Sequence, residues 1–161
     1  MHTKLKPGYL LYRNKWGAEH AGVYLGNYLV LHNSPAGGVE VISYSVYADG
    51  KPVKVIAIDK YNQAELAERL SLILQADASY HVVSNNCEHI ANWLIHGRSY
   101  SPQIQVTVTC ALLGGIVSWK TQRGNPLVIA TLAGLAGCFL YNTTRNYDAV
   151  LPASTNGLIA S

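Results

Sequence analysis

The sequence predicts an α+β domain with a small antiparallel sheet, followed by an apolar helical hairpin. Three observations support this class: β-prone runs and turn residues dominate the N-terminal part, two amphipathic helix patterns follow, and residues 99–161 hold only four of the 21 charged side chains. A chain of 161 residues corresponds to one ordinary domain. The 49% hydrophobic content excludes a disordered protein, and the net charge of +3 is too small to predict a nucleic acid partner.

The expected sheet begins with a β-hairpin. A Gly-Asn turn signal at residues 26–27 separates two β-prone runs, Val23–Leu25 and Tyr28–Leu31. Two more strands are expected at Val39–Val46 and Val53–Ile58, with turn residues between them. The N-terminal half is therefore expected to form an antiparallel sheet.

The first helix is expected directly after the sheet. Asn62 followed by Glu65 matches a capping box, and Leu66, Leu70 and Ile73 recur at helical spacing. This pattern is typical of a helix that packs on a sheet.

A second helix is expected to carry a cysteine in its first turn. A short strand is expected at Tyr80–Val83, and Asn85 then caps a helix in which Glu88 takes the matching third position. Gly97 is a natural C-terminal stop. Cys87 therefore lies at the N-terminus of this helix.

The C-terminal third contains two charge-free runs of 16 residues, Ile104–Trp119 and Pro126–Tyr141. Each would form roughly 24 Å of helix at ~1.5 Å per residue, close to the ~30 Å of a bilayer core. Small residues would allow close helix contact: Gly114, Gly115, Gly134, Ala136 and Gly137. We interpret the runs as a membrane-anchoring hairpin. The alternatives are a buried soluble helix pair, or one crossing helix with the other in the interface.

The chain thus divides into a domain over residues 1–99, a hairpin over residues 100–145 and a polar tail over residues 146–161, for which the sequence predicts no element. Three cysteines are too few, and odd in number, for a disulfide scaffold. We therefore expect a membrane-associated protein whose globular domain is cytosolic. Positive charges flank the hairpin and lie in its turn, so they fix no topology.

Cys87 is the candidate nucleophile. The thiolate is the reactive form of cysteine, and a helix N-terminus lowers the thiol pKa. A neighbouring histidine can act as the base, and a second polar group can orient that base. His20 and His32, on the two strands of the predicted hairpin, are the candidates for these two roles.

The geometry of the hairpin decides whether the two histidines share one face of the sheet. In a strict two-residue turn at residues 26–27, His20 and His32 fall on opposite faces. A three-residue loop, or a bulge that restores the same parity, places both on one face. A cysteine–histidine site therefore predicts the longer loop or the bulge.

The remaining histidines and cysteines have simpler explanations. Four histidines are expected to be surface, core or locally hydrogen-bonded side chains: His2, His81, His89 and His96. Two cysteines in apolar runs are expected to be packing residues: Cys110 and Cys138. Metal binding by Cys87 with the two histidines is a weaker alternative, because no close Cys/His pair has zinc-site spacing. No cofactor is expected.

Two motifs carry a resemblance to a known family. The first is His-Ala-Gly-Val-Tyr-Leu-Gly at residues 20–26, with a second histidine twelve residues after the first, and the second is Asn-Cys-Glu-His at residues 86–89. They resemble the motifs of the lecithin retinol acyltransferase-like family, which includes the HRAS-like suppressor phospholipase/acyltransferases. The resemblance spans roughly residues 7–100, and extends more distantly to NlpC-type peptidases and picornavirus 2A proteins.

The resemblance implies a permuted papain-like fold with Cys87 as nucleophile, His20 as general base and His32 as polarising residue. It also implies three supporting residues within the motifs: Asn86, Glu88 and Tyr24. The implied activity is a membrane-tethered thiol acyltransferase or phospholipase acting on glycerophospholipid esters, with the phospholipid membrane as partner. The alternatives are an NlpC-type cysteine amidase or peptidase, and a non-enzymatic 2A-like membrane adaptor.

Overall fold

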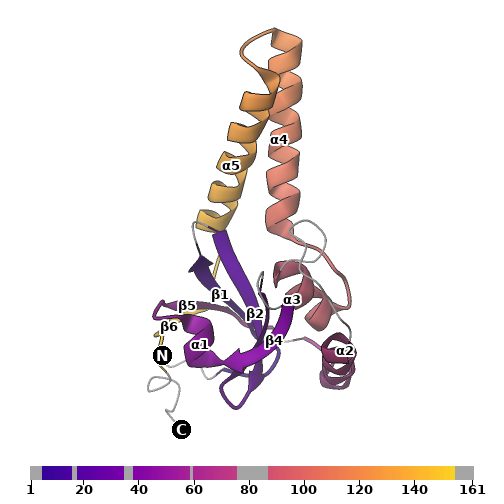
Figure 1. Cartoon of the computed structure of the whole chain (residues 1–161), viewed down its shortest axis with the longest axis vertical. Coiled ribbons are helices and arrows are strands. Elements are labelled where there is room, and N and C mark those ends of the chain that lie inside the picture. Colours follow the sequence, from indigo (N-terminus) through magenta and orange to yellow (C-terminus); the bar gives the residue numbers. More distant parts are fainter. Residues whose placement is uncertain (1–4, 16–17, 35–37, 59, 76–86, 155–161) are drawn as a thin grey trace. The chain divides into compact units, whose positions relative to one another are not determined.

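The chain forms two compact units in a computed structural model that describes residues 5–15, 18–34, 38–58, 60–75 and 87–154 (Figure 1). The globular unit comprises Met1–Lys15, Glu19–Tyr100 and Asn146–Ser161. The hairpin unit comprises Trp16–Ala18 and Ser101–Arg145. Each unit is described separately below.

The globular unit is an α+β domain built on one six-stranded antiparallel sheet, which confirms the predicted class. Its strands are β1 (Leu10–Lys15), β2 (Ala18–Gly26), β3 (Leu29–Ser34), β4 (Gly38–Ser43), β5 (Val53–Ile56) and β6 (Ala149–Leu151). They lie in the order β4-β3-β2-β1-β5-β6. Its helices are α1 (Tyr44–Ala48), α2 (Gln63–Gln75) and α3 (Cys87–His96). The permuted papain-like identity of this fold stays a prediction.

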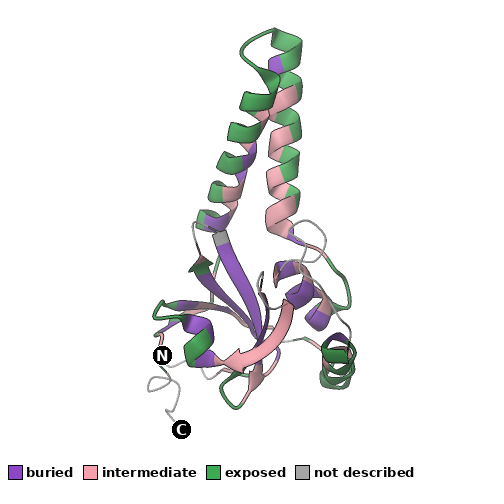
Figure 2. Cartoon of the chain, in the orientation of Figure 1, coloured by how far each residue is buried: buried purple, intermediate pink, exposed green. Residues whose placement is uncertain are grey.

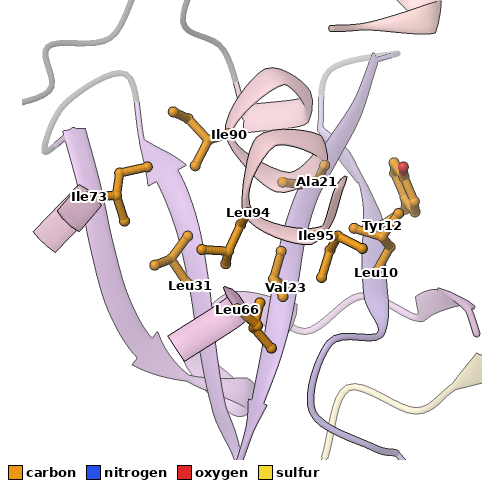
Figure 3. Close-up of a cluster of buried hydrophobic side chains, with 11 residues drawn as sticks. Leu10, Tyr12, Ala21, Val23, Leu31, Leu66, Ile73, Ile90, Leu94 and Ile95 are labelled. Carbon is orange, nitrogen blue, oxygen red and sulfur yellow. The ribbon is translucent and has the colours of Figure 1, made fainter. Parts of the chain in front are cut away.

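One face of the sheet packs against α2 and α3. In β2, Ala21 and Val23 point to this face and join Leu31 of β3 and Leu94 of α3 in a buried apolar cluster (Figure 3). Successive side chains of a strand point to opposite faces, so His20 and Gly22 belong to the other face.

The opposite face packs against α1. Its buried cluster contains Leu11, Val30, Tyr44 and Tyr47, all almost fully excluded from solvent. Burial on both faces explains why β1 is continuously apolar at its start rather than alternating. Because this run of residues does not alternate between apolar and polar, its sequence did not predict a strand.

The β2–β3 hairpin contains the register shift that is needed to place His20 and His32 on the same face of the sheet. Gly22 pairs with His32 and Tyr24 with Val30, but Gly26 pairs with Leu29, so a bulge lies between Tyr24 and Gly26. The two turn residues after Gly26 both have positive φ, as in a type I′ turn. The prediction that a bulge restores the parity is confirmed.

The predicted start of α2 is also confirmed. The Asn62 side-chain oxygen accepts hydrogen bonds from the backbone N–H groups of Ala64 at 3.0 Å and Glu65 at 3.4 Å. The Asn62 amide donates to the Glu65 carboxylate at 3.1 Å. This reciprocal arrangement satisfies N–H groups that an uncapped helix would leave unpaired.

Two expectations about the ends of elements are wrong. The strand expected at Val39–Val46 ends at Ser43, where the serine hydroxyl accepts from the Val46 N–H and caps α1. The expected tail over residues 146–161 supplies β6, which pairs with β5 through Lys54 and Val150 among other residues. A strand of three residues is too short for its apolar pattern to be recognised.

The segment that follows α5 is also held to the globular unit by specific contacts. The Asp148 carboxylate accepts from the Ala57 N–H at 2.8 Å, and the Asp148 N–H donates to the Val55 carbonyl at 2.9 Å. The Tyr44 hydroxyl donates to the Pro152 carbonyl at 2.9 Å. Residues 148–152 are therefore part of this unit.

The hairpin unit consists of α4 (Pro102–Thr121) and α5 (Pro126–Thr144), as expected. Ser101 and Asn125 cap the two helices, and each helix begins with proline. The outward sides of both helices are exposed and apolar (Figure 2). Of the described helices, α5 alone meets the length and hydropathy expected of a membrane span, which is weak support for membrane association.

Small residues bring α4 and α5 into close contact. A Cβ built on Gly114 would lie 2.6 Å from the Ala133 Cβ, and one built on Gly137 would lie 2.6 Å from the Cys110 Sγ. Both approaches are too close for any side chain, so the glycines set the separation of the helices. The prediction is confirmed for these glycines, whereas Ala136 is exposed and lies outside the contact.

Candidate active site

His20 and His32 form a directly bonded pair of imidazoles. The Nε2 atom of His20 lies 2.9 Å from the Nδ1 atom of His32, and the two rings meet edge to face at 5.1 Å between centroids. Both side chains are buried, with 6% and 7% of their surfaces exposed. The sequence analysis predicted that these histidines share a face, and the structure brings them together there.

Tyr47 of α1 holds the His20 strand from the same side. Its ring stacks on the His20 ring at 5.8 Å, and its hydroxyl donates to the backbone carbonyls of His20 at 2.7 Å and Leu11 at 2.9 Å. The space for this ring exists because residue 22 is glycine. A Cβ at Gly22 would lie 2.8 Å from Tyr47 Cε2 and 2.8 Å from Val30 Cγ1.

Burial keeps the histidine pair neutral. It lowers the pKa of His20 to about 3, and the neighbouring His32, Arg13 and Lys15 contribute in the same direction. Burial also lowers the pKa of His32, although the Glu40 carboxylate opposes this effect. At neutral pH, His20 is therefore an uncharged imidazole that can accept a proton.

Cys87 contacts the strand that carries His20 through the backbone. Its Sγ accepts a hydrogen bond from the Ala21 N–H at 3.3 Å. In the described part of the chain, this backbone group, and not an imidazole nitrogen, makes the hydrogen bond between β2 and the thiol. The thiol therefore lies next to the backbone of the residue that follows His20.

The electrostatics of Cys87 differ from the sequence-based expectation. A helix N-terminus was expected to lower the pKa of the thiol. Burial raises the pKa of Cys87 above its ordinary value, and the N–H groups of Ala21 and of the helix start oppose this effect only in part. The free protein therefore pairs a neutral thiol with a neutral imidazole rather than a thiolate with an imidazolium.

Two charged residues near the pair, Arg13 and Glu19, form ion pairs of their own. Arg13 lies 5.6 Å from the Tyr47 ring centroid and forms an ion pair with Asp49 at 2.9 Å. Glu19, which precedes His20 in β2, forms an ion pair with Lys54 at 2.6 Å. It is not among the groups that shift the pKa of His20.

The structure describes two of the three residues that the resemblance gives as supporting, and they lie in different places. Asn86 lies outside the described residues. Glu88 is buried in the first turn of α3 beside the thiol. The Tyr24 hydroxyl accepts from the Tyr28 N–H at 3.2 Å in the hairpin turn, so its hydrogen bond serves the turn rather than the histidine pair.

The expected strand at Tyr80–Val83 and the cap at Asn85 fall outside the described residues, as do His2 and His81. His96 lies exposed in the last turn of α3, and Cys110 packs on α5 as expected. Among the residues that the structure describes, no group of three or more His, Cys, Asp and Glu side chains is placed to hold a metal ion.

Glu40 is a member of the site that the sequence analysis missed. It pairs with His32 in the β3–β4 register, and its Oε1 lies 3.2 Å from the His32 Nε2. The signal was the Pro-Ala-Gly turn sequence at residues 35–37, since a hairpin centred there places residues 32 and 40 opposite each other. The site therefore extends from the two histidine-bearing strands to the neighbouring strand β4.

Comparison with known proteins yields no match, either among family models or among curated proteins.

The arrangement can transfer a proton and form a bond to sulfur. A buried neutral imidazole, a second imidazole bonded to it and a nearby thiol are the components of base-assisted thiol nucleophilicity. The Ala21 N–H donates to the sulfur, so a backbone donor is present that stabilises a thiolate at this position.

Proposed function

We propose that this protein is a membrane-tethered thiol acyltransferase or phospholipase acting on glycerophospholipid acyl esters. The observation that carries the proposal is the 2.9 Å contact between His20 of β2 and His32 of β3, together with the hydrogen bond from the Ala21 N–H of β2 to the Cys87 sulfur. This combination supplies a nucleophile, a base and a residue that orients the base.

The first half of the reaction forms a thioester. The Cys87 sulfur attacks the ester carbonyl while His20 takes the thiol proton. The C–O bond of the ester breaks as the tetrahedral intermediate collapses, and His20 gives the proton to the departing lysophospholipid oxygen. Proton transfer must accompany attack, because the pKa of His20 is lowered and that of Cys87 is raised.

The second half releases the acyl group. Water, an alcohol or an amine attacks the thioester carbonyl and loses a proton to His20. The C–S bond breaks, and the proton returns to the Cys87 sulfur. Which acceptor takes the acyl group determines whether the protein is a hydrolase or a transferase.

The hairpin unit supports a lipid substrate over a peptide. Its outward side chains are large and apolar, with Leu112, Trp119, Leu127 and Phe139 each about 60% exposed or more. A contiguous surface of this kind is unfavourable in water and favourable in a bilayer. A thiol attached to such a hairpin is held close to lipid esters.

The test is mass spectrometry of the full chain after incubation with phosphatidylcholine vesicles. We expect the mass of one acyl group on the peptide that contains Cys87, lost on treatment with neutral hydroxylamine. Cys87→Ala should abolish both the adduct and the release of lysophospholipid. Cys110→Ala is the matched control and should retain both.

Three outcomes would overturn the proposal. Lysophospholipid release that persists in Cys87→Ala would exclude Cys87 as the nucleophile. Equal acylation of Cys110 and Cys138 would indicate unspecific thiol chemistry and favour a non-enzymatic adaptor. An acyl adduct formed from a peptide substrate but not from vesicles would favour the amidase alternative.

A further inference from the structure

We infer that Glu40 is a positioning residue that determines which imidazole nitrogens of the His20–His32 pair carry protons. The β3–β4 register places Glu40 directly opposite His32, and the carboxylate Oε1 lies 3.2 Å from the His32 Nε2. At this distance the carboxylate raises the pKa of His32 through its charge and its contact with Nε2, in opposition to the effect of burial.

A neutral imidazole has one N–H and one bare nitrogen. The 2.9 Å contact allows two proton arrangements: the His20 Nε2–H donates to the His32 Nδ1, or the reverse. In the reverse arrangement, the bare Nε2 of His32 would direct its lone pair toward the Glu40 carboxylate. In the first arrangement an N–H dipole faces that carboxylate, so the first arrangement is favoured.

The first arrangement leaves one nitrogen of His20 without a proton. His20 carries its single proton on Nε2, where it donates to His32. Its Nδ1 is therefore the bare nitrogen and the only atom of the pair that can accept the thiol proton. This consequence for catalysis rests on the proposed function, whereas the proton arrangement itself does not.

The groups around the pair are consistent with this arrangement. Arg13 and Lys15 of β1 are cationic, and Tyr47 of α1 directs its hydroxyl hydrogen to the carbonyls of His20 and Leu11. Burial and the cations lower the pKa of both histidines, so the pair is neutral at pH 7.5. Cys87 on α3 is a thiol at that pH, because burial raises its pKa. Among these groups, Glu40 carries the negative charge that lies next to the His20–His32 pair.

The position of Glu40 allows a clean substitution. It lies on β4, an edge strand of the sheet, and 43% of its side-chain surface is exposed. Replacing it with lysine reverses the charge near the His32 Nε2 without removing buried apolar surface. The lysine favours a bare Nε2 on His32, and therefore a proton on His32 Nδ1 and on His20 Nδ1.

The test is long-range ¹⁵N–¹H NMR of the histidine rings in the full chain in detergent at pH 7.5. In the unchanged protein we expect both His20 and His32 to carry their proton on Nε2. In Glu40→Lys we expect both to carry it on Nδ1. Glu65→Lys, a reversal of another exposed carboxylate on α2, is the matched control and should leave the pattern unchanged.

The NMR result and the activity result separate the two proposals. A Nδ1 proton on His20 in the unchanged protein, or the same pattern in Glu40→Lys, would overturn the role of Glu40. If Glu40→Lys does not fold, Glu40→Gln is used instead, because it removes the negative charge without adding a positive one. An unchanged proportion of the two tautomers in Glu40→Gln would then overturn the inference. If the tautomers follow Glu40 while Cys87→Ala retains full activity, only the proposed function fails.

A second inference concerns the topology of the hairpin and rests on the β5–β6 pairing. We propose that the hairpin crosses the bilayer twice, with both of its ends on the side of the globular unit. The chain leaves that unit at Tyr100 and returns to it at Asn146, because β6 is part of its sheet. A single crossing would place β5 and β6 on opposite sides of the membrane.

Both helices are long enough for two crossings, and α5 alone of the described helices also has the hydropathy of a membrane span. Helix α4 has 20 residues and α5 has 19, which at ~1.5 Å per residue corresponds to roughly 30 Å each, the thickness of a bilayer core. The connecting turn holds Lys120 and Arg123, whose long side chains can reach the lipid headgroups. This inference rests on the membrane tether of the proposed function but not on its chemistry.

The test uses three single cysteines in the full chain in sealed membrane vesicles: Glu65→Cys on α2, Val150→Cys on β6 and Gln122→Cys in the turn. A membrane-impermeant maleimide is added before or after permeabilisation, and mass spectrometry identifies the labelled peptide. We expect Glu65→Cys and Val150→Cys to label alike and Gln122→Cys to show the opposite accessibility. Equal labelling of all three in intact vesicles would overturn the double crossing, whether or not the protein has acyltransferase activity.

Discussion

The Nε2 of His20 lies 2.9 Å from the Nδ1 of His32 although the two residues are not backbone partners. The partner of His32 is Gly22, and His20 lies two residues earlier on the same face of β2. The imidazoles therefore meet diagonally across the strands, above a residue without a side chain.

As the pH is lowered, the free energy of unfolding should begin to fall at a higher pH than protonation of carboxylates alone would cause. The unfolded chain protonates His20 near its ordinary pKa of about 6.5, whereas the folded protein holds that pKa at about 3. The contribution of neutral His20 to the free energy of unfolding is complete above pH 6.5. It is lost as the pH falls toward 3, by up to about 1.4 kcal/mol per pH unit. Urea unfolding of the full chain in detergent at pH 7.5, 6.0 and 5.0 measures the slope.

His32 should add to this slope, because burial also lowers its pKa. His20→Phe should flatten the pH dependence, whereas His96→Gln, on the exposed end of α3, should leave it unchanged. Equal stability at pH 7.5 and 5.0 in the unchanged protein would contradict the burial of the pair.

Tyr47→Phe should destabilise the globular unit by about 1–2 kcal/mol, because two buried carbonyls lose their shared donor. Stacking on His20 survives, but the carbonyl of His20 is released, so the ring signals of His20 in NMR should shift. Tyr44→Phe is the matched control, since its hydroxyl donates to the Pro152 carbonyl away from the histidines. It should lower stability without moving those signals.

Gly22→Ala should cost about 1–3 kcal/mol through overpacking, because the added methyl meets Tyr47 and Val30 at 2.8 Å each. The displaced Tyr47 ring should alter the His20 signals as well. Gly50→Ala provides a comparison: it has open space but a positive φ of 70°, so its cost is confined to the backbone. Shifts of the His20 signals in both variants would argue against a local effect of the methyl group.

Gly114→Leu should separate α4 from α5, because its side chain would occupy the position of the Ala133 Cβ. We expect a lower melting temperature of the hairpin in detergent, followed by circular dichroism of the full chain. Ala136→Leu adds a side chain of the same size at an exposed position of α5 and should be tolerated. A similar loss in both variants would show that bulk, not the helix contact, is responsible.

Elements that depend only on residues close together in the sequence were predicted from local sequence patterns. The bulge was expected only on the premise that His20 and His32 share a face, whereas the cap at Asn62 and the glycine-mediated hairpin follow from short-range rules. These features depend on backbone geometry and alternation, which neighbouring residues determine.

Long-range pairing was not predictable in the same way. Tyr47 directly follows the segment expected to form a strand, Val39–Val46, and its ring reaches His20 only because α1 packs on this face of the sheet. Glu40 joins the pair through the register of a second hairpin. The pKa of Cys87 was predicted in the wrong direction, because burial depends on the whole globular unit and outweighs the helix N-terminus.

The position of β6 has a consequence for biosynthesis. A ribosome delivers residues 101–145 before it delivers the strand that completes the sheet, so the globular unit cannot finish folding until the hairpin has been synthesised. A protein truncated at residue 99 would leave β5 as an open edge, with the N–H and C=O groups of Val53 and Val55 free to pair with another chain. Recombinant production of the folded globular unit alone would therefore require β6 to be rejoined to β5 by a short linker that replaces the two apolar helices.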